Sequence, residues 1–457
     1  MKNSALFLYF LLFILVLQSC KTKPEETRTV DIDSAQTIAG APDWILQGNI
    51  YEVNIRQYTK EGTFKAFEQH LDRLRDMGVQ TLWFMPVQPI SKKDRKGTLG
   101  SYYAIADYTA TNPEFGTMED WKHLVNTAHE KGFKIIIDWV ANHTGADHRW
   151  LTQKPDFFTK DSAGNFIAPN DWTDVRELNY DSKELRDSMV ASMKYWITQS
   201  DIDGFRCDVA GDVPGDFWKD CIASLRKEKE IFMLAEGDKP LLHAVGFNAS
   251  YAWPMFHKMK NVAAGYSPAF ALDSEYNYSD TAFPANAMYM YFTSNHDENS
   301  WNKADYGTMP GRIHEPFAVF TQTAKGSVPL IYSGQEEPVL RKIEFFEKDA
   351  MTFNKLQRAP FYKILLTLRK NNPAFAADAS FKKVNVGDST AIYSFVKEKA
   401  GKKALVILNL SAKEQTITVN DPSLHGKPYN VFMFTNEELS NKPWKLESWG
   451  YVIYEYK

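Results

Sequence analysis

Apolar and polar positions alternate in two rhythms along the chain from about residue 48 onward. Short apolar runs are typical of strands, and apolar residues that recur every three or four positions are typical of amphipathic helices. Two of the helical stretches end at a glycine, as helix C-termini often do. The apolar runs predict strands at 49–58, 79–87, 133–140, 202–210, 231–237, 247–254, 288–299 and 327–338. The helical spacing predicts helices at 63–78, 118–132, 182–199, 216–229 and 357–371.

The order of these elements indicates the fold class. Eight strands that alternate with helices favour an α/β fold, a closed parallel (β/α)8 TIM barrel. A doubly wound open sheet is the alternative. It is disfavoured because no glycine-rich phosphate loop follows the first strand.

Two segments depart from the barrel pattern. Residues 144–181, after the third strand, are rich in Gly, Pro, Asp and Trp and contain no clear barrel element. A loop of this length inside a barrel is usually functional, and we interpret it as an inserted domain. After about residue 378 the pattern changes to short alternating strands, which predict a C-terminal antiparallel β-sandwich domain at 378–457. The barrel is therefore expected to span residues 43–377.

The N-terminus is a targeting segment rather than part of the fold. Lys2 precedes an apolar run at 5–17, which is shorter than the roughly 20 residues of a spanning helix. The run ends in "LQSC", which resembles a bacterial lipobox, so we expect a signal peptide at 1–20 and lipidation of Cys20. An uncleaved anchor or an ordinary signal peptide is the alternative. The polar stretch 21–42 would be a flexible tether that holds an extracytoplasmic protein on a bacterial membrane, at the periplasmic face or the cell surface.

Composition narrows the partners. The net charge is −4, so electrostatics favour neither nucleic acid nor an anionic membrane surface, and the lipid would be the only membrane contact. Aromatic residues reach 14%, which suits stacking on sugars as well as it suits a large aromatic core. Beyond Cys20, only Cys207 and Cys221 remain, and we expect buried thiols rather than a bridge.

Polar side chains follow several of the predicted barrel strands. In a (β/α)8 barrel these strand ends converge on one face, where active sites are built. The residues concerned are Asp138, Asn142 and His143 after the third strand, Arg206 and Asp208 on the fourth, Glu236 on the fifth, and Asn295, His296 and Asp297 on the seventh.

The convergent carboxylates suit glycoside hydrolysis, which needs one carboxylate beneath the anomeric carbon and one carboxylic acid beside the leaving oxygen. Arg206 lies two residues before Asp208 and would keep that carboxylate ionised as the nucleophile. Glu236 has no cation on its own strand and would be the acid/base. Asp297 would bind sugar hydroxyls. A metal hydrolase is disfavoured because no closely spaced histidine pair lies near the strand ends.

At these residues the chain resembles the α-amylase family of glycoside hydrolases, family 13. The motifs "DWVANH", "GFRCDVA", "LAEG" and "FTSNHDEN" look like its four conserved regions, in order and on the expected strands. The resemblance implies that Asp208, Glu236 and Asp297 are catalytic. It also implies that Tyr103 stacks on the sugar being cleaved. We expect His143, Arg206 and His296 to bind substrate with it.

The resemblance further implies retaining chemistry on α-linked glucans, with oligo- or polysaccharides as partners. In a retaining enzyme the two catalytic carboxyl groups lie about 5–5.5 Å apart. A glucan transglycosylase or a trehalose-forming isomerase is the alternative within the family. A glycan-binding protein without catalysis is the alternative outside it.

One turn departs from the family pattern. Many members carry Lys and His where this chain has Gly211 and Asp212. In those amylases the pair binds the reducing-end side of the substrate, and the His carbonyl ligates a structural calcium. Asn142 and Glu177 occupy positions where such a calcium could be held. No cofactor is expected to take part in the chemistry.

Overall fold

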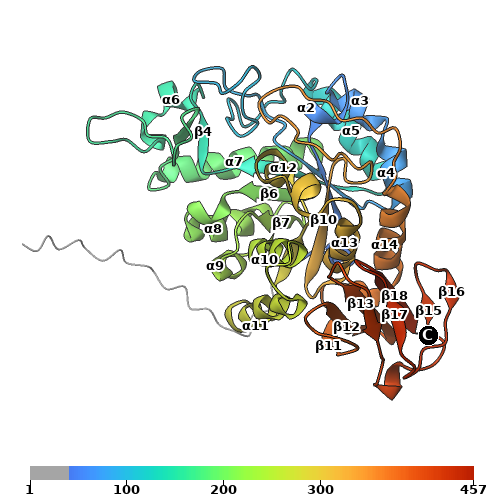
Figure 1. Cartoon of the computed structure of the whole chain (residues 1–457). Helices are drawn as coiled ribbons and strands as arrows, with labels where there is room; N and C mark the ends of the chain where they lie inside the picture. The colour runs from blue at the N-terminus through green and yellow to red at the C-terminus, as the bar shows by residue number, and fades with distance from the viewer. Residues whose placement is uncertain (1–40, 457) are drawn as a thin grey trace, which may run out of the picture. The chain divides into compact units, whose positions relative to one another are not determined.

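The computed structural model describes residues 41–456, apart from the side chains of residues 304 and 305. The signal peptide expected at 1–20, Cys20 and nearly all of the expected tether lie outside the described residues. Eight parallel strands close into a barrel, which confirms the predicted fold class (Figure 1). In chain order they are β1 (Ile50–Val53), β2 (Thr81–Phe84), β3 (Lys134–Val140), β6 (Gly204–Asp208), β7 (Phe232–Ala235), β8 (Ala249–Tyr251), β9 (Met288–Tyr291) and β10 (Ser327–Tyr332).

The barrel closes where its first and last strands meet. Ile50 of β1 is in register with Thr81 of β2 on one side and with Leu330 of β10 on the other. At the start of β6 the neighbouring strand comes very close, because a Cβ added at Gly204 would lie 2.0 Å from the carbonyl oxygen of Phe232. Glycine is therefore required at this position. All eight strands point the same way, so their C-terminal ends share one side of the barrel.

Helices surround the barrel, and several differ from the predicted ranges. The main ones are α5 (Met118–Glu130), α7 (Lys183–Ser200), α8 (Gly215–Leu225), α10 (Trp253–Ala263), α11 (Asp273–Ala282), α13 (His314–Thr323) and α14 (Ala359–Asn371). The pattern did not predict α10, α11 or α13. In α13 nearly every residue is buried, so the helix lacks the polar face on which a periodic pattern depends.

Three predicted elements were too long. The predicted strand 49–58 is β1 followed by the short helix α2 (Ile55–Tyr58), in which all four residues are buried as they would be in a strand. The predicted helix 63–78 is two helices, α3 (Phe64–Glu68) and α4 (Leu71–Met77). The predicted strand 288–299 ends at Tyr291. Asn295 then caps helix α12 (His296–Asn302) by accepting a hydrogen bond from the Glu298 N–H at 2.8 Å.

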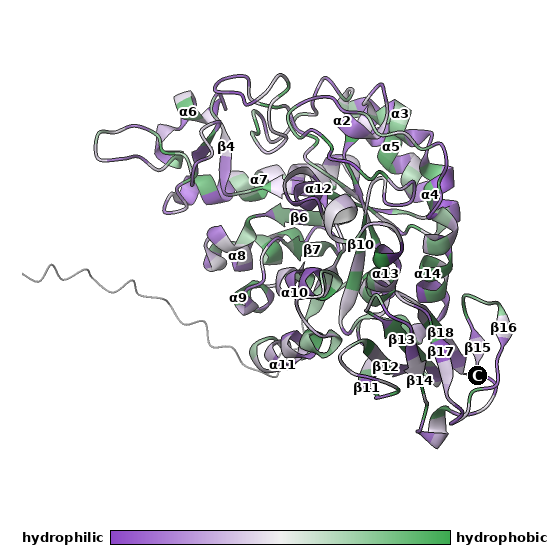
Figure 2. Cartoon of the chain, viewed as in Figure 1, coloured by the Kyte–Doolittle hydropathy of each residue, from purple (hydrophilic) through white to green (hydrophobic). Residues whose placement is uncertain are grey.

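The insertion after β3 contains a small antiparallel sheet of β4 (His143–Gly145) and β5 (Val175–Glu177), with α6 (Trp150–Gln153) between them. The C-terminal part is antiparallel and contains a six-stranded sheet with the order β11-β12-β13-β18-β15-β16. Its central strands are β12 (Ile392–Lys399), β13 (Lys402–Asn409) and β18 (Tyr451–Tyr456). Figure 2 shows hydrophobic residues on barrel strands such as β6 and β7 and on β13.

Two further expectations concern single features. Cys207 and Cys221 are both buried and free, as predicted. Between residues 41 and 456, no helix has the length and apolar character needed to cross a bilayer.

Arg369 of α14 joins the barrel to the segments that precede and follow it. Its side chain is 1% exposed, and its guanidinium donates to five backbone carbonyls. The acceptors are the carbonyl oxygens of Leu46, Gly48, Gln322, Ser327 and Phe375. One buried cation therefore satisfies acceptors near the start of β1, near the start of β10 and at the beginning of the C-terminal part.

We expect Arg369→Leu to lower the free energy of unfolding by roughly 3 kcal/mol or more, because several buried carbonyls would lose their only side-chain donor. Urea titration followed by circular dichroism measures the change. The exposed pair of Arg312 and Glu447 provides a matched control, and Arg312→Leu should cost less than about 1 kcal/mol. Equal effects of the two substitutions would contradict the proposed role of Arg369.

Candidate active site

A cavity of about 400 Å³ is lined by residues that follow several barrel strands. It brings together Tyr103, His143, Asp208, Glu236, His296 and Asp297, six of the seven predicted catalytic and substrate-binding residues. The other residues in its wall are Lys96, Ser101, Trp172, Asp174, Val175, Val209, Trp301, Phe345 and Phe346. The seventh predicted residue, Arg206, is not part of the cavity lining, but it pairs with Asp208 and Glu236, which are.

The Arg206 guanidinium is fully buried on β6 and contacts three carboxylates. Its Nη1 lies 2.9 Å from Asp138 Oδ1 and 3.0 Å from Asp208 Oδ1. Its Nη2 lies 3.0 Å from Glu236 Oε2. Glu236 has no cation on its own strand, as expected, but Arg206 of the neighbouring strand β6 lies beside it. Sequence reasoning considered only the residues on the strand of Glu236 itself.

Aromatic rings surround the same guanidinium. Arg206 Nε donates a hydrogen bond of 3.0 Å to the Tyr251 hydroxyl. The Arg206 Cζ lies 5.2 Å from the ring centre of Trp83, 5.4 Å from that of Tyr251 and 5.8 Å from that of Tyr103. These distances are within the range of cation–π attraction, which helps to stabilise a cation that has lost its water.

One guanidinium cannot neutralise three carboxylates. Burial raises the pKa of Asp208 well above its usual value, and the charge of Glu236 raises it further, while Arg206 opposes both effects. Burial likewise raises the pKa of Asp138. Arg206 lowers the pKa of Asp208, as expected, but the combined effect of burial and the neighbouring carboxylates is larger, so the pKa of Asp208 stays above its usual value.

The residue after Asp208 orients Glu236. Val209 has φ 36° and ψ 46°, a left-handed conformation that β-branched residues rarely adopt. This conformation directs the Val209 N–H to Glu236 Oε2 at 2.7 Å. Such strain is typical of functional sites, and here it positions one carboxylate oxygen.

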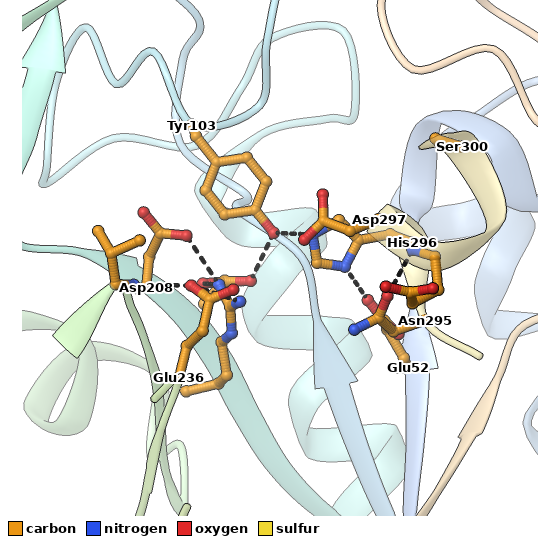
Figure 3. A network of polar contacts seen from close by, with 12 residues as sticks. Glu52, Tyr103, Asp208, Glu236, Asn295, His296, Asp297 and Ser300 are labelled. Atoms are coloured by element: carbon orange, nitrogen blue, oxygen red, sulfur yellow. Dashed lines mark hydrogen bonds and ion pairs between the residues drawn. The ribbon is translucent and has the colours of Figure 1, made fainter. Parts of the chain in front are cut away.

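A second polar network leads from the cavity to β1. His296 Nδ1 contacts Glu52 Oε1 at 2.5 Å, and its Nε2 lies 2.8 Å from the Tyr103 hydroxyl and 3.3 Å from Asp297 Oδ2. The Tyr103 hydroxyl in turn donates to Asp138 Oδ2 at 3.1 Å. Hydrogen bonds and ion pairs thus connect Glu52 to the carboxylates around Arg206 (Figure 3).

The charge state of His296 follows from these contacts. Burial alone would lower the pKa of His296, but the charges of Asp297 and Glu52 outweigh burial and raise that pKa to about 9. At neutral pH His296 is therefore an imidazolium that donates from both ring nitrogens.

The imidazole ring of His143, in contrast to that of His296, carries no charge. Burial lowers the pKa of His143 to about 3, so its ring is neutral at neutral pH. It packs edge to face against Trp172 of the insertion, with ring centres 5.5 Å apart. A neutral imidazole in the cavity wall can hydrogen-bond to a sugar hydroxyl through either nitrogen.

Besides the other residues of the cavity wall, three residues of the polar network around Arg206 and His296 were not predicted as site residues: Glu52, Asp138 and Tyr251. Glu52 is the only acid in β1, where all four residues are buried. A single carboxylate within an apolar strand was a usable signal, because unpaired charges are almost never fully buried. Asp138 was recognised at a strand end but was given no role. Tyr251 had no signal, because a buried tyrosine is equally common in an ordinary core.

A lysine from another loop lies beside the turn that departs from the family pattern. Lys239, from the loop after β7, donates from Nζ to the Gly211 carbonyl oxygen at 3.2 Å. Asp212 is exposed. A lysine therefore lies beside the turn, although it comes from a different loop.

The expected calcium ligands do not form a convincing calcium site. Ca²⁺ takes six to eight oxygen ligands, several of them usually carboxylates. The Asn142 amide nitrogen lies 3.4 Å from His143 Nδ1, and Glu177 Oε1 accepts a hydrogen bond from Thr159. Among residues 41–456, no three His, Cys, Asp or Glu side chains come together as metal ligands would. The structure therefore does not confirm a calcium ion at Asn142 and Glu177.

A closed barrel whose strand ends hold carboxylates around a cavity is the arrangement of a (β/α)8 enzyme. The sequence model of the alpha-amylase catalytic domain matches residues 33–361. The chain therefore belongs to the alpha-amylase family.

Individual relatives agree with this membership. The chain is 25% identical to the alpha-amylase MalA of Haloarcula japonica over 397 residues, which are 82% of this chain and 57% of MalA. It thus spans little more than half the length of that relative. The structure of the noncanonic maltogenic alpha-amylase AmyB from Thermotoga neapolitana matches with a TM-score of 0.81 at 26% identity, over 90% of this chain and 98% of AmyB. An alpha-amylase from Lactobacillus plantarum matches with a TM-score of 0.81 at 28% identity, over 90% and 99% of the two chains.

We expect Glu52→Gln to lower the pKa of His296 by about 1–3 units, because it removes a charge that holds the proton. NMR titration of ¹⁵N-labelled imidazoles measures this pKa. Because the folded value is about 9 and the ordinary value is 6.5, the stability from this charge is complete below pH 6.5 and is lost as pH rises through 9. In the Glu52→Gln variant the pKa of His296 in the folded protein is lower, so the stability from its charge is lost at a lower pH.

The control for this variant is Glu275→Gln, which removes a carboxylate that pairs with Lys258 outside the cavity. It should leave the titration of His296 unchanged. A wild-type His296 that titrates near 6.5 would contradict the charge state inferred from the contacts.

Proposed function

We propose that this protein hydrolyses α-linked glucans, such as starch-derived maltodextrins, with retention of the anomeric configuration. One observation carries the proposal: Asp208 and Glu236 contact the two arms of a single buried guanidinium at the edge of the cavity. Two carboxyl groups held side by side suit a nucleophile and an acid/base that share one scissile bond. The substrate class is supported by the relatives named alpha-amylase.

In the proposed reaction Asp208 attacks the anomeric carbon while Glu236 protonates the leaving oxygen. This step requires Asp208 ionised and Glu236 protonated. Because the two carboxyl groups lie on one guanidinium, their charges interact, and the proposed step has the proton on Glu236 and the negative charge on Asp208. Glu236 then removes a proton from the water that releases the sugar from Asp208.

The remaining cavity residues would bind the sugar. The Asp297 carboxylate and the charged His296 lie together and can accept from and donate to neighbouring hydroxyls. The Tyr103 ring can stack on the sugar, and its hydroxyl is held in place by Asp138 and His296. Hydrogen bonds that strengthen as the ring distorts would lower the barrier.

Glu236→Gln should reduce kcat on maltoheptaose by about 10²–10⁴-fold, because the amide cannot donate the proton. Thermal unfolding should stay within a few degrees of wild type, which separates lost chemistry from lost structure. The Glu275→Gln variant is the matched control and should retain full activity. Undiminished turnover by Glu236→Gln would overturn the assignment.

Product analysis on maltoheptaose tests the reaction itself. Hydrolysis yields shorter maltooligosaccharides, and NMR of the first products should show the α-anomer. Longer products would indicate glucosyl transfer, and a non-reducing isomer would indicate a trehalose-forming reaction. Binding without any product would leave a glycan-binding protein as the better description.

We also propose that the mature protein is a lipoprotein, exported and held on a bacterial membrane through Cys20. The apolar run at 5–17 and the "LQSC" sequence support this proposal. A single lipid chain holds a protein on a membrane only weakly, so stable attachment needs a second anchoring signal. Additional acyl chains on the same cysteine would supply it.

For the full-length protein expressed in a bacterium, Cys20→Ser should abolish incorporation of labelled palmitate. The glucan-hydrolysing activity should move out of the membrane fraction, with its kcat unchanged. Cys221→Ser is the control, because that thiol is buried and should not affect labelling. Palmitate incorporation that persists in Cys20→Ser would contradict the proposal.

A further inference from the structure

The cavity has two unequal ends. The acid stands beside the leaving oxygen, so the leaving part of the substrate lies on the Glu236 side. The sugar retained on Asp208, the glycone, therefore extends toward Tyr103, His296 and Asp297, which lie across from Glu236 (Figure 3). Whatever packs beyond these three residues decides how many further sugars fit on the glycone side.

A loop crosses the cavity wall near Tyr103. This crossing loop, residues 92–100, is joined to the insertion by two ion pairs. Lys96 Nζ lies 3.3 Å from Asp174 Oδ1, and both residues line the cavity. Asp94 Oδ2 lies 2.5 Å from Arg176 Nη2. The Asp174 side chain is only 6% exposed and the Lys96 side chain is 35% exposed, so the pair extends from the buried part of the wall to its accessible surface.

The other end of the crossing loop is joined to the segment after β10. The Leu99 N–H donates to the Phe346 carbonyl oxygen at 3.0 Å, and the Thr98 N–H donates to Glu347 Oε1 at 2.8 Å. The backbone at Gly97 lies so close to Phe346 that a Cβ added at Gly97 would lie 2.5 Å from the Cβ of Phe346. The insertion, the crossing loop and the segment after β10 thus form one continuous rim.

The segment after β10 is itself held firmly. Gln57 Nε2 donates to the carbonyl oxygens of Glu344 and Glu347, each at 2.7 Å. Asn299 of α12 donates to the Arg341 carbonyl and accepts from the Ile343 N–H at 2.8 Å. A segment tied to two helices at both of its ends is a fixed wall rather than a mobile flap.

Aromatic rings fill the space behind the glycone side. Phe345 lies nearly parallel to Tyr103, with ring centres 6.3 Å apart and planes 11° apart. Trp301 packs on Phe345 with ring centres 5.5 Å apart and also contacts Phe346. Phe345 is 9% exposed and fills the space beside Tyr103, whereas Trp301 is 51% exposed and forms the outer edge of this wall.

We propose that the Lys96–Asp174 pair and the Phe345–Trp301 wall close the glycone end, so that the enzyme acts from the non-reducing ends of glucan chains. The inference rests on the proposed function. Lys96 and Asp174 offer a donor and an acceptor to the hydroxyls of a terminal sugar, which an internal sugar does not expose. The cavity of about 400 Å³ is near the lower end of the roughly 300–1,000 Å³ typical of small-ligand pockets.

The test compares maltoheptaose, labelled at its reducing end, with the same molecule carrying a 4,6-O-benzylidene acetal on its non-reducing terminal sugar. We expect kcat/KM on the blocked substrate to be at least about 100-fold lower. The unblocked substrate should release one short product of fixed length from the first turnover. Equal kcat/KM on both substrates, with mixed product lengths, would overturn the inference while leaving the proposed function intact.

Variants test whether the preference for an unblocked non-reducing end depends on the Lys96–Asp174 pair. Lys96→Ala and Asp174→Asn should each raise the ratio of blocked to unblocked kcat/KM by about tenfold, because they open the closed end. Lys194→Ala, which breaks the surface pair with Glu228, is the matched control and should leave the ratio unchanged. A ratio that stays at the wild-type value in both cavity variants would overturn the role of the pair. Absence of turnover on both substrates in the wild type would instead refute the proposed function.

Discussion

The site depends on one buried positive charge. Arg206 has no exposed surface, so the barrel must supply countercharges and hydrogen-bond acceptors for it. Carboxylates from β3, β6 and the end of β7, together with a hydroxyl from β8, meet at its guanidinium. Because a guanidinium is planar and its donors point in fixed directions, it also sets where the carboxylates lie relative to one another. The arrangement of these carboxylates therefore follows from their contacts with one buried cation.

The same imbalance of charge explains why the pKa values of Asp208 and His296 are raised. Two cations, Arg206 and the protonated His296, face five carboxylates. The excess of negative charge adds to burial in keeping Asp208 a weak acid, and it keeps a proton on His296. Both effects have the same cause. Buried negative charge that is not balanced by nearby cations favours proton binding.

Much of this site was visible in the sequence, because barrel strands end in polar residues at regular intervals. The three expected catalytic carboxylates, Tyr103 and both histidines line the same cavity. What the sequence could not provide were contacts across strands. The pairing of Arg206 with Glu236 depends on the register between β6 and β7, and the Lys96–Asp174 pair depends on two loops that no local pattern connects. The helix α13 was missed for a related reason, since complete burial removes the polar face that periodicity detects.

The junction at Arg369 has a consequence for the order in which the chain acquires its structure. Ribosomes and export channels deliver a protein from its N-terminus, but β1 obtains its second neighbour only when β10 is present, some 280 residues later. The guanidinium that seals this junction is a further 42 residues beyond Ser327. Contacts between such distant positions form slowly, so most of the chain emerges before the barrel can close. The closed barrel is therefore a property of the nearly complete chain, and its N-terminal half alone leaves one side of β1 without its partner strand.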